Sequence, residues 1–104
     1  MCGIAGIVDP KSREKKINAG TLKKMSDVIT HRGPDSDGLW ISQNYEAGFS
    51  FRRLAIIDLS ESGNQPMSTR DGRFTIVFNG EVYNHSQIRE ELISKGYNYR
   101  SGTD

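Results

Sequence analysis

The first third of the chain shows one strand pattern and one helix pattern. Residues 3–9 form a short apolar run interrupted by glycine, which predicts a largely buried strand. A polar, charged loop follows over residues 10–16, and a capping residue, Asn18 or Thr21, then predicts a helix that ends near Thr30. The apolar face of this helix consists of Leu22, Met25, Val28 and Ile29. We expect that face to pack in the core.

The middle of the chain shows strand patterns. Residues 38–43 and 47–58 predict two strands of an antiparallel meander, joined by a turn at residues 44–46. The Asp71–Gly72 pair is typical of a type I′ hairpin turn. It leads into residues 73–78, whose β-branched and aromatic side chains predict a further strand.

A second helix pattern occupies the C-terminal third. It covers roughly residues 85–95, with Asn84 and Gln87 spaced as a capping box and Gly96 as the stop signal. The apolar face consists of Ile88, Leu92 and Ile93. Residues 97–100 begin one more strand. The resulting order, β-α-β-β-β-α-β with an antiparallel core, predicts an α+β fold.

A balanced charge and a single cysteine narrow the classes of function. The 104 residues include 14 Lys and Arg against 13 Asp and Glu, a net charge of +1. This balance argues against nucleic-acid binding and against a polybasic membrane patch. No apolar run is long enough to span a membrane, and the N-terminus lacks the basic region of a signal peptide, so we expect a cytoplasmic, reducing location. One cysteine and two histidines argue against a disulfide framework and against a metal site.

Cys2 is the first candidate for chemistry. After removal of the initiator methionine, Cys2 would carry a thiol beside a free α-amine, a group that titrates close to neutral pH. One residue would then supply both the attacking sulfur and the general base. A retained Met1 would turn the amine into an amide and remove that base. The alternative is an incidental or redox-sensitive thiol, although the chain has no second cysteine to resolve an oxidised one.

Asn79 and Gly80 follow the strand predicted over residues 73–78. Attack on an amide creates an oxyanion, which fixed hydrogen-bond donors must stabilise. The side-chain amide of Asn79 and the N–H of Gly80 could supply two such donors. The alternative is that this pair forms only a turn.

Arg52 and Arg53 lie inside an otherwise apolar strand pattern. The two-residue period places their side chains on opposite faces, so one of them points toward a cleft or a partner. A guanidinium at Arg53 could bind a substrate carboxylate through two hydrogen bonds. The alternative is an internal ion pair with Asp58 or Glu81.

Six segments, spread in order over nearly the whole chain, resemble one known family. They are Cys2-Gly3-Ile4-Ala5-Gly6, His31-Arg32-Gly33-Pro34-Asp35, Arg53-Leu54-Ala55-Ile56-Ile57-Asp58, Gln65-Pro66-Met67, Asn79-Gly80-Glu81-Val82-Tyr83-Asn84-His85 and Arg100-Ser101-Gly102-Thr103-Asp104. On these residues the chain resembles the class II glutamine amidotransferase domain, an N-terminal nucleophile hydrolase. The branch that it resembles most is the glutamine-hydrolysing asparagine synthetases.

The resemblance implies hydrolysis of L-glutamine to glutamate and ammonia. Cys2 matches the nucleophile, which forms a γ-glutamyl thioester, and Asn79 and Gly80 match the oxyanion hole. Arg53 matches the residue that holds the glutamine α-carboxylate, and Asp104 the residue that receives the α-ammonium group. The substrate-binding set that the resemblance implies is Arg53, Leu54, Ala55, Ile56, Ile57, Asn79, Gly80, Glu81 and Asp104.

The resemblance also implies a larger architecture than 104 residues hold. The family fold is an αββα sandwich, of which residues 1–104 would be the N-terminal part, about half. The ammonia-accepting synthetase domain would lie outside this chain. ATP and Mg²⁺ are expected only in that domain, so no cofactor is expected here. One departure is Phe51, which stands where many relatives carry histidine.

A non-catalytic module is the alternative to an enzyme. An unfinished sheet exposes N–H and C=O groups along its edge, and such an edge favours pairing with another strand. Under this alternative the chain folds, forms a homodimer through that edge and turns over no substrate.

Overall fold

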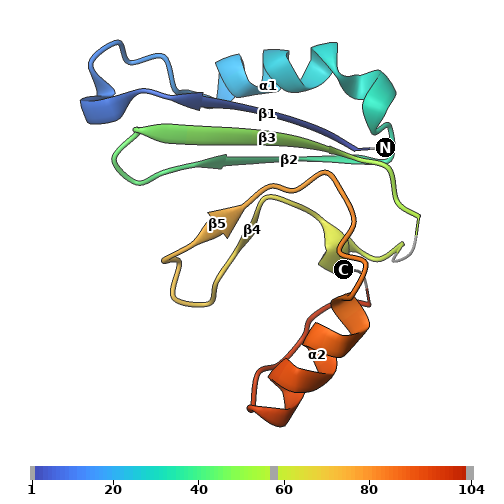
Figure 1. The fold of residues 1–104 in the computed structure, drawn as a ribbon. Helices are drawn as coiled ribbons and strands as arrows, with labels where there is room; N and C mark the ends of the chain where they lie inside the picture. Colours follow the sequence, from blue (N-terminus) through green and yellow to red (C-terminus); the bar gives the residue numbers. More distant parts are fainter. Residues whose placement is uncertain (1, 57–58, 103–104) are drawn as a thin grey trace. The chain divides into compact units, whose positions relative to one another are not determined.

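The computed structural model describes residues 2–56 and 59–102 (Figure 1). The chain divides into two compact units. The first contains the residues up to Leu54 together with Asn64–Asn79, and the second contains Ala55–Gly63 and the residues from Gly80 onward. Two small sheets and one helix lie in the first unit, and a second helix lies in the other. This α+β composition confirms the predicted fold class at that level.

The larger sheet is antiparallel and has three strands. It consists of β1 (Gly3–Val8), β2 (Ser36–Ile41) and β3 (Ala47–Arg53), in the order β1-β3-β2. The predicted strand at the N-terminus and the predicted meander are therefore confirmed. The second strand of the meander is shorter than predicted, because the chain leaves the sheet at Leu54.

Helix α1 (Ala19–Val28) begins at a side-chain cap. The N–H of Thr21 donates to Oδ1 of Asn18 at 2.8 Å, so Asn18 rather than Thr21 is the capping residue. A 3₁₀ turn, η1 (Pro10–Ser12), lies in the charged loop before the helix, and another, η2 (Thr30–Arg32), follows the helix.

One face of the larger sheet is covered by α1 (Figure 1). Leu22 and Ser26, one helical turn apart, are fully buried there. The glycine at position 48 of β3 permits this approach, because a Cβ atom there would lie 2.9 Å from Leu22 Cδ1. Val28, predicted to be buried, is instead 77% exposed. It lies six residues beyond Leu22, on the side of the helix that faces away from the sheet.

The other face of this sheet holds Phe51, which is 1% exposed, and the stacked rings of Trp40 and Phe49, 5.2 Å apart. Phe51 is therefore a core residue. The segment at Gln65 crosses this face over β2, because a Cβ atom on Gly38 would collide with the carbonyl oxygen of Gln65.

The smaller sheet is a hairpin of β4 (Met67–Ser68) and β5 (Thr75–Ile76). The hairpin was predicted, and the strand predicted over residues 73–78 is present but shorter, covering Thr75–Ile76. The N–H of Phe74 donates to the Thr69 hydroxyl at 3.1 Å instead of continuing a regular ladder. The type I′ turn was wrong. Gly72 has a φ of 70°, but Asp71 lies outside the left-handed region that such a turn requires there.

The second unit contains a 3₁₀ turn, η3 (Glu61–Gly63), and helix α2 (His85–Ser94). The capping box was wrong. The backbone of Asn84 (φ −101°, ψ 25°) is not in the extended conformation of a side-chain cap, and its side chain caps no N–H. The predicted stop is confirmed. Gly96 has a φ of 90°, and the next residue, Tyr97, donates its N–H to the carbonyl of Leu92 at 3.0 Å.

The strand predicted at residues 97–100 was wrong, because that segment has no strand conformation. A side chain of α2 binds it instead. The guanidinium of Arg89 lies 4.5 Å from the ring centre of Tyr99 and donates to the carbonyl of Ser101 at 2.9 Å. Within residues 2–56 and 59–102, no helix has the length and apolar character needed to cross a membrane.

Candidate functional site

Cys2 lies directly before β1 and contacts Leu54, the residue directly after β3. The register pairs Gly3 with Arg52, which carries Cys2 to the end of β3. The N–H of Leu54 donates to Sγ of Cys2 at 3.4 Å, and the thiol donates to the carbonyl of Leu54 at 3.7 Å. The predicted nucleophile is therefore half-buried and held by backbone groups at one end of the sheet.

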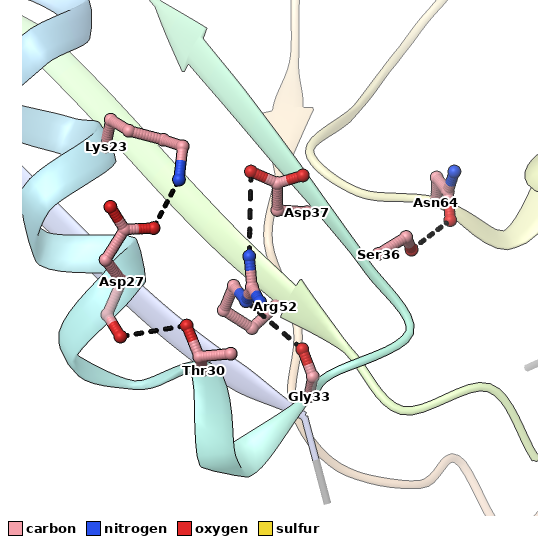
Figure 2. A network of polar contacts seen from close by, with 8 residues as sticks. All are labelled: Lys23, Asp27, Thr30, Gly33, Ser36, Asp37, Arg52 and Asn64. Carbon is pink, nitrogen blue, oxygen red and sulfur yellow. Dashed lines mark hydrogen bonds and ion pairs between the residues drawn. The ribbon is translucent and has the colours of Figure 1, made fainter.

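The two arginines point to opposite faces of the sheet, as their alternation predicted. Arg52 lies on the face covered by α1, where its Nε donates to the carbonyl of Gly33 at 3.1 Å (Figure 2). Its Nη1 lies 3.7 Å from a carboxylate oxygen of Asp37. Arg52 thus ties together β3, β2 and the turn before β2.

Arg53 is 7% exposed on the opposite face. Its Nη1 donates to Oδ1 of Asn64 at 2.9 Å, and the same oxygen accepts a hydrogen bond from the Ser36 hydroxyl at 3.0 Å. Figure 2 shows the second of these bonds. The alternative ion pair of Arg53 with Asp58 or Glu81 stays a prediction, since Asp58 lies outside the described residues and Glu81 belongs to the second unit.

Phe78, the residue before Asn79, has its backbone hydrogen-bonded by the side chain of Gln65. The N–H of Phe78 donates to Oε1 of Gln65 at 2.5 Å, and Nε2 of Gln65 donates to the carbonyl of Phe78 at 3.2 Å. The carboxamide of Gln65 replaces a strand partner at this position and directs the backbone that enters Asn79. Asn79 itself is half-buried.

Sequence reasoning assigned no role to Asn64 or Gln65. The available signal was the pair of adjacent carboxamide side chains before Pro66. Such side chains can replace backbone partners wherever regular strand pairing ends.

The segment around Gly33 packs closely against the end of β3. A Cβ atom on Gly33 would collide with the carbonyl of Arg52 and lie 2.6 Å from the nitrogen of Arg53. The N–H of Asp35 donates to the carbonyl of Arg53 at 3.0 Å. This segment therefore stabilises the backbone from which the Arg53 side chain extends.

The remaining predicted substrate-binding residues belong to the second unit or lie outside the described residues. Ala55, Ile56, Gly80 and Glu81 belong to the second unit, and Ile56 is 74% exposed. Ile57 and Asp104 lie outside the described residues. The oxyanion pair, the role of Glu81 and the ammonium-binding role of Asp104 therefore stay predictions.

The end of the larger sheet combines groups suited to nucleophilic attack on a substrate that carries a carboxylate. An N–H donor directed at the sulfur stabilises negative charge on it, and a charged hydrogen bond of this kind is stronger than a neutral one. The N–H donor is that of Leu54, and the positively charged Arg53 is the residue directly before it. The low exposure of Arg53 limits screening by water.

Comparison with known proteins gives a family for the whole chain. A sequence model described as "glutamine amidotransferase domain" matches residues 1–104. Asparagine synthetase [glutamine-hydrolyzing] 1 of Bacillus subtilis (strain 168) is 44% identical over 105 residues, which cover 100% of this chain and 16% of that protein.

Two further relatives show the range of names. Asparagine synthetase [glutamine-hydrolyzing] 1 of Arabidopsis thaliana is 36% identical over 106 residues, covering 100% of this chain and 17% of the relative. The protein named amidase chry2 of Gibberella zeae is 39% identical over 100 residues, covering 88% and 15%. The chain spans about a sixth of the length of these relatives. As the six segments predicted, it belongs to the glutamine amidotransferase domain family, among relatives that include the glutamine-hydrolysing asparagine synthetases.

Proposed function

We propose that this chain carries the glutaminase site of an asparagine-synthetase-like enzyme. The observation that carries the proposal is the thiol of Cys2 bound by the backbone of Leu54, the residue directly after the buried Arg53. A nucleophile and a cation for a substrate carboxylate thus come from adjoining positions at one end of a rigid sheet. Membership of the amidotransferase family supports the same reaction.

The reaction is a two-step acyl transfer. The sulfur of Cys2 attacks the side-chain amide carbon of L-glutamine, and the α-amine of Cys2 takes the thiol proton. The proton is passed to the departing nitrogen, the C–N bond breaks, and ammonia leaves a γ-glutamyl thioester. Water then attacks the thioester carbon, a proton of that water passes to the sulfur as the C–S bond breaks, and glutamate leaves while the thiol is regenerated. Asn79 and Gly80 are proposed to stabilise the oxyanion in both steps.

Recognition of glutamine requires opposite charges for its two α-substituents. We propose Arg53 for the α-carboxylate and Asp104 for the α-ammonium group, with Glu81 near the polar end of the substrate. The segment from Leu54 to Ile57 would contribute backbone contacts around it. A guanidinium suits a carboxylate because its N–H groups match the two oxygens.

The larger assembly is also part of the proposal. Residues 1–104 would be the N-terminal part of an αββα sandwich, and the relatives, about six times longer, leave ample length for a synthetase domain. That domain would receive the ammonia and bind ATP and Mg²⁺. The acceptor molecule is not assigned, because the relatives carry names of more than one kind.

The test measures glutamate release from L-glutamine by the full-length gene product. Electrospray mass first establishes that Met1 has been removed. We expect the processed protein to release glutamate and to form a covalent adduct at Cys2 with a glutamine-like electrophile. Cys2→Ala abolishes both, and Cys2→Ser, which keeps a hydrogen-bonding hydroxyl, forms no thioester.

The contrary result is a processed, folded protein that neither releases glutamate nor labels at Cys2. That result would favour the non-catalytic module. Light scattering then distinguishes a monomer from the homodimer that pairing through the sheet edge predicts.

A further inference from the structure

We infer that Asn64 is a positioning residue for glutamine recognition. Its neutral carboxamide orients the guanidinium of Arg53 toward the substrate carboxylate without adding a negative charge beside it. The inference rests on the proposed function, because the binding of the glutamine α-carboxylate by Arg53 is part of that proposal.

Two side chains donate to a single oxygen of Asn64. Oδ1 of Asn64 accepts from Nη1 of Arg53 at 2.9 Å and from the Ser36 hydroxyl at 3.0 Å. Ser36 and Arg53 are direct register partners on β2 and β3. Rotation of the Asn64 carboxamide therefore breaks two hydrogen bonds at once, and both partners are anchored in the same sheet.

The chemical type of the acceptor distinguishes Arg53 from its neighbour. On the α1 face, Arg52 lies beside the carboxylate of Asp37 and has a structural role. On the other face, Nη1 of Arg53 donates to an amide oxygen, Oδ1 of Asn64. A carboxylate orients a guanidinium but also competes with an anionic ligand for its charge, whereas an amide oxygen only orients it.

The low exposure of Arg53 makes the effect of a negative charge at position 64 large. Arg53 is 7% exposed, so a charge placed at position 64 would interact with its guanidinium through little water. Asn64→Asp is nearly isosteric and keeps an oxygen acceptor for both Ser36 and Arg53. The substitution therefore tests the charge at position 64 while preserving the shape and the hydrogen-bond acceptor.

The experiment measures the Kd of L-glutamine by calorimetry in the full-length gene product carrying Cys2→Ala, which separates binding from chemistry. Asn64→Asp should raise the Kd by about tenfold or more. Ser36→Ala, which frees the carboxamide to rotate, should raise it severalfold. The matched ligand is L-glutamine α-amide, which lacks the carboxylate, and its weaker binding should be unchanged by Asn64→Asp. With Cys2 intact, the same variant should raise KM and leave kcat within about twofold.

Three results would overturn the inference. An unchanged Kd for L-glutamine in folded Asn64→Asp protein removes the role of Asn64 and leaves the proposed function intact. An equal loss of binding for L-glutamine and its α-amide shows a general structural effect instead. If the Cys2→Ala protein binds no glutamine and the unsubstituted protein hydrolyses none, the proposed function fails and the inference falls with it. If Asn64→Asp does not fold, the Kd values of L-glutamine and of its α-amide are compared in Ser36→Ala. A rise for L-glutamine alone supports the inference, and an equal rise for both overturns it.

Discussion

The backbone of Leu54 contacts the sulfur of Cys2 through both of its polar groups. The N–H lies 3.4 Å from Sγ, and the carbonyl oxygen lies 3.7 Å from it. The two residues are 52 positions apart in sequence and meet because β1 and β3 are antiparallel neighbours. A thiolate can still accept a hydrogen bond from the N–H of Leu54, whereas it has no proton to donate to the carbonyl.

Leu54→Pro removes that donor and should lower the reactivity of Cys2. The preceding residue, Arg53, is already in a strand, the conformation that a following proline favours. We expect the rate of alkylation by iodoacetamide to fall roughly three- to tenfold, the effect of one hydrogen bond, and glutamine turnover to fall with it. Cys2 is the single cysteine of these 104 residues, so a peptide mass map identifies its adduct.

Leu54→Ala is the matched control, because it shortens the side chain and keeps the N–H. Its alkylation rate should stay close to that of the unsubstituted protein. Equal rates for the proline and alanine variants, with both folded, would show that the N–H does not activate the thiol.

Gly33→Ala should destabilise the protein through contact with the backbone. The φ and ψ of Gly33 are −154° and 86°, so an alanine can adopt this conformation. Its Cβ, however, would lie 2.6 Å from the nitrogen of Arg53. We expect the free energy of unfolding to fall by about 1–3 kcal/mol in urea titrations. Gly102→Ala, whose Cβ would meet no atom within 4 Å, should change it by less than about 0.5 kcal/mol. Equal values for the two variants would contradict the packing.

The pKa of Asp71 is below its usual value, first because the Thr69 hydroxyl donates to its carboxylate and second because the Arg73 N–H does. Because the pKa of Asp71 is lower in the folded state, its carboxylate stabilises the hairpin at pH values above the pKa that Asp71 has in the unfolded chain. That contribution is lost as the pH falls through the folded pKa. Thr69→Val should raise the pKa of Asp71 toward its usual value in an NMR titration, whereas Thr69→Ser should preserve it. An unchanged pKa in Thr69→Val would rule out the hydroxyl as the main cause.

Local patterns predicted the elements of the first unit well. The apolar run of β1, the helical spacing of α1 and the meander of β2 and β3 depend on neighbours close in sequence, and all three are present. Predictions of which side chain is buried or caps a helix were less accurate. Val28 is exposed because Ser26 faces the sheet instead, and Asn84 caps no N–H because its backbone is not extended.

The C-terminal part shows the same limit. Arg89 binds the segment around Tyr99, which the apolar pattern alone would extend as a strand. Polar contacts between distant residues leave no period in the sequence, so a pattern cannot reveal them.

For the candidate site, residue types and order were sufficient to single out Cys2, Arg53 and Asn79 and to predict the amidotransferase family, which the comparisons confirm. Their physical settings required folding. Antiparallel pairing brings the sulfur of Cys2 to the backbone of Leu54, and the same sheet joins Ser36 to Arg53 through Asn64. Chemistry that belongs to single side chains is visible in a sequence. The orientation and charge environment of those side chains arise from contacts between segments far apart in the chain, and these exist only once the sheet has formed.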